Sequence, residues 1–134
     1  MGSKSSMKGM LLLATPLAIS PAYAVTEEDF LVRNAENLVN LCTTPPRDPL
    51  HAAAVNFCTG YLVGAYQYHE SLNSGPDSHP LVCPPEPKPT RQQAIAEFVT
   101  WAQAHPEYRN ERPVDVMFRF MAGRWPCKKP PGQE

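Results

Sequence analysis

Apolar residues recur with helical spacing in four stretches of this chain, and proline-rich segments separate the stretches. In the first stretch the apolar positions fall at i, i+4, i+7 and i+11, the period of one face of an amphipathic helix. These positions are Leu31, Ala35, Leu38 and Cys42. Thr26 is a suitable N-cap, and the acidic residues directly after it favour the positive end of a helix. The pattern therefore predicts one continuous helix over residues 27–42.

The second stretch predicts a longer helix over residues 49–72, with Asp48 as N-cap and Pro49 in the first helical position. Its expected apolar stripe is Ala54, Phe57, Cys58, Tyr61, Ala65, Tyr68 and Leu72. Gly60 and Gly64 lie four residues apart within it, and glycine inside a helix costs about 1 kcal/mol against alanine. We expect another backbone to pack closely over these glycines, with Tyr61 in the core beside them.

Two further helices are predicted over residues 91–104 and 113–124, the first opened by a Thr90–Gln93 capping box. The expected apolar faces are Ile95, Phe98, Val99 and Ala102, with Trp101 at the edge, and then Val114, Met117, Phe118 and Met121. No alternating strand pattern is present. The predicted fold class is all-α, a small four-helix bundle, with residues 128–134 as a flexible C-terminal tail.

The first 24 residues have the pattern of a secretory signal peptide. Lys4 and Lys8 supply positive charge, a short apolar run follows, and Ala22-Tyr23-Ala24 fits the small-residue cleavage signal. The apolar run is too short to span a bilayer. We expect cleavage after residue 24, export to an oxidising compartment without membrane insertion, and a helical domain over residues 25–127.

Export changes how the four cysteines are interpreted. An even number of cysteines in a small exported domain favours two disulfides, and four cysteines allow three pairings. The cysteines are Cys42, Cys58, Cys83 and Cys127. Zinc binding is the alternative, but the chain has no C-x-x-C pair and its four histidines are scattered. We therefore expect no metal and no cofactor.

Composition and motifs argue against nucleic-acid binding and against catalysis. Without Lys4 and Lys8 the basic residues fall from 12 to 10 against 13 acidic ones, a net charge of −3 with no basic stripe. The chain contains no G-x-S-x-G, H-E-x-x-H or phosphate-binding loop motif. Cys58 has His51 and His69 on roughly its own helical face, but a disulfide-bonded cysteine is not a nucleophile. We assign no catalytic residue and expect the protein not to be an enzyme.

Residues 73–89 form a polar connection of 17 residues without helical or strand periodicity. Connections of this length in compact domains are often functional or disordered. Cys83 would hold its middle, and the neighbouring Leu81 and Val82 are apolar in a polar stretch. The simplest interpretation of those two side chains is that they pack under the disulfide.

Four short segments occur in an order that matches a known family. They are Asn34 with Leu38, Leu41 and Cys42; Phe57-Cys58-Thr59-Gly60-Tyr61-Leu62-Val63-Gly64; Cys83-Pro84-Pro85; and Trp125-Pro126-Cys127. The chain resembles the Rap1a/Tai immunity proteins of Gram-negative bacteria. It departs from the family pattern where Pro84 stands in place of the usual Leu, and in the proline-rich run that follows.

The resemblance implies a periplasmic immunity protein that binds and blocks a peptidoglycan amidase toxin delivered by type VI secretion. It also implies a small helical bundle, with a homodimer as one alternative. An inhibitor needs a rigid scaffold and a surface element that plugs a cleft, and a nearby crosslink would limit the entropy that such a loop loses on binding. The candidate partner-binding residues are Asn73, Ser74, Asp77, Ser78, His79, Leu81 and Val82.

Two other functions with the same size and export remain open, an acid-stress chaperone of the periplasm and an envelope accessory protein. The disulfide pairing also stays open from the sequence. We favour Cys42–Cys58, which would close the first two helices as a hairpin, and Cys83–Cys127, which would tie the long connection to the C-terminal end. The first pairing requires Cys42 to reach about two turns along the second helix.

Overall fold

The computed structural model describes Gly2 and residues 24–128. The predicted signal peptide and C-terminal tail therefore lie outside the described residues, apart from Gly2, Ala24 and Lys128. In chain order the elements are the 3₁₀ helix η1 (Glu27–Leu31), α1 (Ala35–Cys42), α2 (His51–Leu72), α3 (Arg91–Ala104), the 3₁₀ helix η2 (Pro106–Tyr108) and α4 (Pro113–Arg124). The described residues contain no strand, which confirms the all-α class with four α-helices.

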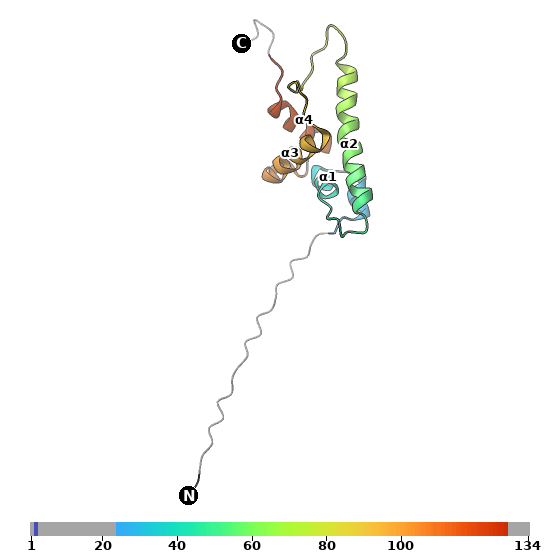
Figure 1. The fold of residues 1–134 in the computed structure, drawn as a ribbon, viewed down its shortest axis with the longest axis vertical. Helices are drawn as coiled ribbons and strands as arrows, with labels where there is room; N and C mark the ends of the chain where they lie inside the picture. Colours follow the sequence, from blue (N-terminus) through green and yellow to red (C-terminus); the bar gives the residue numbers. More distant parts are fainter. Residues whose placement is uncertain (1, 3–23, 129–134) are drawn as a thin grey trace.

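Helix α2 is the longest element and forms one side of the molecule, as Figure 1 shows. The other three α-helices pack beside it, and the connection from α2 to α3 turns back at the end of α2. The core between the helices contains Leu38, Leu41, Ala54, Cys58, Phe98, Val116, Met117 and Phe120.

The predicted first helix is wrong in one respect, because it is broken at residues 32–34. Val32 adopts a left-handed backbone conformation with φ 47° and ends η1. Asn34 then starts α1 as its N-cap, since its side chain accepts a hydrogen bond of 3.0 Å from the Asn37 amide. Asparagine competes with the helix for backbone groups and is favoured at such starts. The apolar period alone did not reveal this second helix start.

A buried carboxylate, Asp29, joins the two parts of the broken helix. It is 5% exposed and accepts hydrogen bonds from the Thr26 amide at 2.9 Å and from the Asn37 and Asn40 side chains at 3.0 Å each. Burial raises the pKa of Asp29, but the bonds from Thr26, Asn40 and Asn37 together outweigh it and hold the pKa below its ordinary value. The folded protein therefore favours the ionised form.

Helix α2 ends at Leu72 as predicted but begins at His51, two residues later than predicted. The Asp48 carboxylate accepts from the Leu50 amide at 2.8 Å, so Asp48 and Pro49 form a turn ahead of the helix. The buried face is Ala54, Cys58, Leu62 and His69. The predicted stripe was wrong at Phe57, Tyr68 and Leu72, which are 38%, 66% and 65% exposed. The stripe is rotated because α4 packs against the His69 side of the helix.

Helices α3 and α4 have the predicted bounds. The capping box of α3 is confirmed, with Thr90 and Gln93 exchanging hydrogen bonds of 2.9 and 3.2 Å. Phe98 is the fully buried residue of α3, and the expected Met117 and Met121 are buried in α4. Val116 and Phe120 are also buried there, while Val114 and Phe118 are only half-buried, so the face of α4 is broader than predicted.

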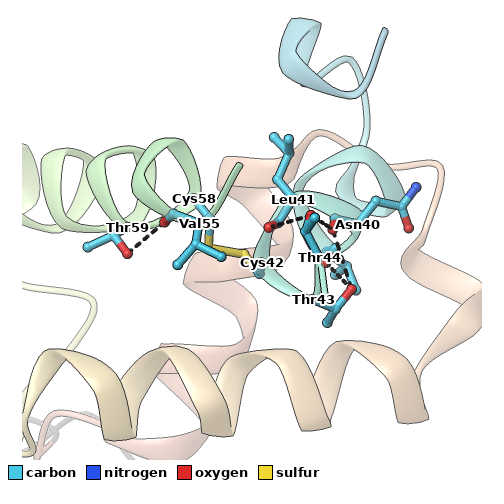
Figure 2. The surroundings of a disulfide bond; sticks show 9 residues. Asn40, Leu41, Cys42, Thr43, Thr44, Val55, Cys58 and Thr59 are labelled. Carbon is cyan, nitrogen blue, oxygen red and sulfur yellow. Dashed lines mark hydrogen bonds between the residues drawn. A yellow bond between two sulfur atoms is a disulfide. The ribbon is translucent and has the colours of Figure 1, made fainter. Parts of the chain in front are cut away.

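Both favoured disulfides are confirmed. Cys42–Cys58 joins the end of α1 to α2 with a Cα–Cα distance of 5.2 Å, as Figure 2 shows. The turn that allows this is stabilised by Thr44, whose hydroxyl donates to the Asn40 carbonyl at 2.9 Å. Cys83–Cys127 joins the long connection to the segment after α4, with a Cα–Cα distance of 4.9 Å.

The predicted close packing over the two glycines of α2 is not observed within the chain. Gly60 and Gly64 are exposed, and a Cβ added at either would meet nothing within 4 Å. Tyr61 beside them is half-buried and packs against the core, as expected. The glycines therefore lie on an open face of α2.

We predict that Asp29→Asn lowers the free energy of unfolding by about 1–3 kcal/mol at neutral pH, because an amide donor replaces one of the acceptor oxygens. The folded pKa of Asp29 is lowered, so its contribution is complete above the unfolded pKa and is lost as pH falls through the folded pKa. Urea unfolding of both proteins at several pH values measures this. Glu28→Gln, at an exposed position, is the control and should change little. A difference that persists unchanged in acid would contradict the prediction.

We predict that Gly60→Ala and Gly64→Ala each stabilise the protein by about 0.5–1 kcal/mol, because alanine is the better helix former and the space around each site is open. Thermal unfolding of the single and double variants measures this. A loss of stability would show that another backbone does contact this face.

Candidate partner-binding loop

The candidate site is the loop of residues 73–82, which leaves the end of α2. Asn73 ends the helix, since its amide donates to the carbonyls of His69 at 3.2 Å and Glu70 at 3.1 Å. The Asn73 side chain adds a bond of 2.8 Å to the same His69 carbonyl. Ser78 closes a turn onto the Gly75 carbonyl at 3.2 Å. The start of the loop is therefore fixed to the last turn of α2.

The far end of the loop is fixed as well. The Leu81 amide donates to the ring Nε2 of His69 at 3.0 Å, and Val82 is buried in the core. Cys83 follows with its disulfide, and its amide donates to the Trp125 carbonyl at 2.9 Å. A surface loop with its ends held close together is the arrangement of an Ω-loop. Its backbone is ordered without a strand or helix.

The predicted partner-binding residues differ in how far they are exposed. Ser74, Asp77, His79 and Leu81 are exposed, and Asn73 and Ser78 are half-buried. Val82 is only 4% exposed and packs in the core, so it anchors the loop and has little free surface to offer a partner. Leu81 next to it is 61% exposed and does not pack under the disulfide.

From the sequence His69 has no part in the site, and the structure buries it beside the loop. Its side chain is 7% exposed. It packs between Tyr66 of α2 and Phe118 of α4, at ring-centroid distances of 6.1 and 5.3 Å. The signal was present in the sequence, since position 69 lies on the same face as Cys58.

Exposed apolar side chains gather at this end of α2. Tyr68 and Leu72 lie in its last turns, and Leu81 lies at the end of the loop, each more than 60% exposed. Apolar and aromatic anchors among polar groups are typical of protein–protein interfaces. The loop and the end of α2 therefore form one surface with polar and apolar contacts to offer.

The second half of the connection lies over a groove between α2, α3 and α4. The groove has a volume of about 250 Å³ and an apolar floor that includes Phe98, Met117 and Phe120. Across its edge Lys88 bonds to Glu70 at 3.0 Å, and this contact raises the pKa of Lys88. Burial, followed by the nearby Glu70, raises the pKa of Tyr66 in the groove wall. The ion pair is exposed, so it adds little stability.

The described residues contain no group of three or more His, Cys, Asp or Glu side chains placed to hold a metal ion. Among the helices of residues 24–128, none is both long and apolar enough to cross a membrane. The features that stand out in this part of the chain are a crosslinked helical scaffold and a loop held at both ends.

The described residues form a small helical domain with two disulfides and a loop that is held at both ends. A model of the Rap1a immunity proteins matches residues 34–127, from the cap of α1 to the last cysteine. The match covers well over half of the chain, and the protein therefore belongs to the Rap1a immunity protein family. Neither a search of curated proteins nor one of solved structures found a match.

Family membership defines the general function. The protein is an immunity protein, and its partner is a secreted toxin protein. Immunity proteins of this family are generally not enzymes.

We predict that mild reduction opens Cys83–Cys127 before Cys42–Cys58. Cys83 is exposed, whereas Cys58 is 1% exposed, so a thiol reagent reaches the Cys83–Cys127 bond more readily than the Cys42–Cys58 bond. Alkylation after timed reduction, read by mass spectrometry, gives the order in which the two bonds open. Earlier modification of Cys42 and Cys58 would contradict the prediction.

The variant with both Cys83→Ala and Cys127→Ala should lose about 4 kcal/mol of stability, because the Cys83–Cys127 bond closes a separation of 44 residues.

Proposed function

We propose that the protein is exported to the periplasm, where it binds and inhibits a peptidoglycan amidase toxin delivered by type VI secretion. The clamped loop of residues 73–82 is the observation that carries this proposal. Its polar groups and exposed Leu81 provide the contacts with which an inhibitor fills an enzyme cleft. Because both ends are fixed, the loop loses less conformational entropy on binding than a free loop would.

Export is supported by the two disulfides and by the sequence pattern of the first 24 residues. Disulfides form and persist in oxidising compartments such as the bacterial periplasm. Peptidoglycan lies in that same compartment, so an amidase that attacks it must be blocked there. The homodimer expected as an alternative stays a prediction, and light scattering of the purified mature protein measures it.

The partner is identified by a pull-down with the mature, oxidised protein against periplasmic and secreted fractions of its source. We expect recovery of a cell-wall amidase whose activity is blocked at an equal molar ratio. Recovery of many unrelated proteins at acid pH alone would instead favour the chaperone function. An empty pull-down would favour an envelope accessory role.

We predict that replacing Asp77, His79 and Leu81 together by alanine abolishes inhibition of the amidase and leaves stability unchanged. Leu81→Ala alone should weaken binding about 30-fold, the effect of losing about 2 kcal/mol at an interface anchor. Calorimetric titration and a peptidoglycan hydrolysis assay measure these effects.

The matched control is the double variant Leu31→Ala and Glu36→Ala. Both side chains are exposed, Leu31 at 54%, and they lie on η1 and α1 near the opposite end of α2 from the loop. This variant should inhibit the amidase normally. Unchanged inhibition by the loop variant, or equal loss in the control, would reject the loop as the inhibitory element.

A further inference from the structure

One residue, His69, closes the loop at both of its ends. Its backbone carbonyl accepts from the amide and from the side chain of Asn73, at 3.2 and 2.8 Å. Its ring Nε2 accepts from the Leu81 amide at 3.0 Å. The residues between these two contacts include the exposed Asp77 and His79. The shape of the partner-binding loop therefore depends on the position of one buried ring.

The contact with Leu81 defines the chemical state of that ring. A backbone N–H is a donor, so Nε2 must carry a lone pair, and the neutral ring then carries its proton on Nδ1. Nδ1 is buried and has no hydrogen-bond partner among the described residues. A protonated ring has donors at both nitrogens and cannot accept from Leu81. Protonation of His69 and closure of the loop thus exclude each other.

The side chains around the His69 ring provide no partner for a positive charge on it. The rings next to it are Tyr66 and Phe118. On the same helix the nearest carboxylate in sequence, Glu70, is paired with Lys88 of the connection. The charged residues of α4 are Asp115, Arg119 and Arg124, which form ion pairs with Arg112, Glu111 and Glu97, and the loop adds the exposed Asp77 and His79. No hydrogen bond or ion pair joins any of these groups to His69 in the described part of the chain.

We propose that His69 is the positioning residue of the toxin-binding loop and that the loop is set for binding only while this ring is neutral. The proposal rests on the proposed function for its biological meaning. Acid releases Leu81 and loosens residues 74–81. The rest of the domain stays folded, because Val82 in the core and the Cys83–Cys127 bond lie just beyond the released contact.

The contact between His69 and the Leu81 amide is tested on the isolated, oxidised protein by nuclear magnetic resonance, with hydrogen exchange of the Leu81 amide as the readout. We expect protection at neutral pH that falls about tenfold in acid, after correction for the intrinsic pH dependence of exchange, since a protonated ring cannot accept from this amide. His69→Leu keeps the apolar volume but offers no acceptor, so protection should be lost at both pH values. His69→Gln offers an acceptor oxygen that does not titrate, so it should restore protection and remove the pH dependence.

The matched control for exchange is His79→Gln, an exposed histidine of the same loop. This variant should leave the pH dependence of Leu81 unchanged. A Leu81 amide that is unprotected in the native protein, or that loses its pH dependence in His79→Gln and keeps it in His69→Gln, would overturn the proposal.

Measurements of amidase inhibition then distinguish a failure of the His69–Leu81 contact from a failure of the proposed function. Binding should weaken about tenfold in His69→Leu and return in His69→Gln, in parallel with exchange. If exchange follows the expected order while all variants inhibit equally, the loop is not the inhibitory element and the proposed role of the loop fails. If binding weakens equally in both His69 variants, the ring acts through packing alone, which rejects the positioning role.

Discussion

The disulfide between Cys83 and Cys127 is the constraint that makes the long connection a structural element. The stretch between α2 and α3 has no helix or strand of its own. The crosslink, the bond from the Cys83 amide to Trp125 and the burial of Val82 fix its middle against the end of α4. The positions of the segments before and after Cys83 depend on this attachment. The part before it becomes a closed loop, and the part after it lies along the groove between α2, α3 and α4.

Sequence reasoning succeeded where local chemistry and tertiary packing agree. Helices α3 and α4 begin at a capping box and at a proline, and both ends match the prediction. The first helix failed because a capping asparagine within an unbroken apolar period changes the backbone but leaves the period intact. The sequence left the disulfide pairing open, and the two favoured pairs, Cys42–Cys58 and Cys83–Cys127, are the ones observed. The apolar period thus locates the helices, but it does not reveal a break within one apolar run.

The candidate site was predictable as a segment and less so residue by residue. Proline and polar residues located the loop, but the periodicity does not tell which of two adjacent apolar side chains turns inward. Val82 does, and Leu81 does not. The burial of His69 was missed because histidine is read as a surface residue at a helix end, whereas the packing of α4 decides its environment. These outcomes depend on tertiary packing, which the local pattern of a single sequence does not reveal.

The buried Nδ1 of His69 is the one buried side-chain polar atom without a partner in the described residues. Such an atom costs free energy that an apolar side chain at this position would not, so stability alone does not account for the histidine. The contact that does require it is the one from Nε2 to the Leu81 amide, because no apolar side chain accepts a hydrogen bond. The free-energy cost of the unpaired Nδ1 is therefore linked to the hydrogen bond by which Nε2 holds the end of the loop. Departures from local stability rules of this kind are expected at functional sites, and here the departure lies next to the loop that we propose to bind the toxin.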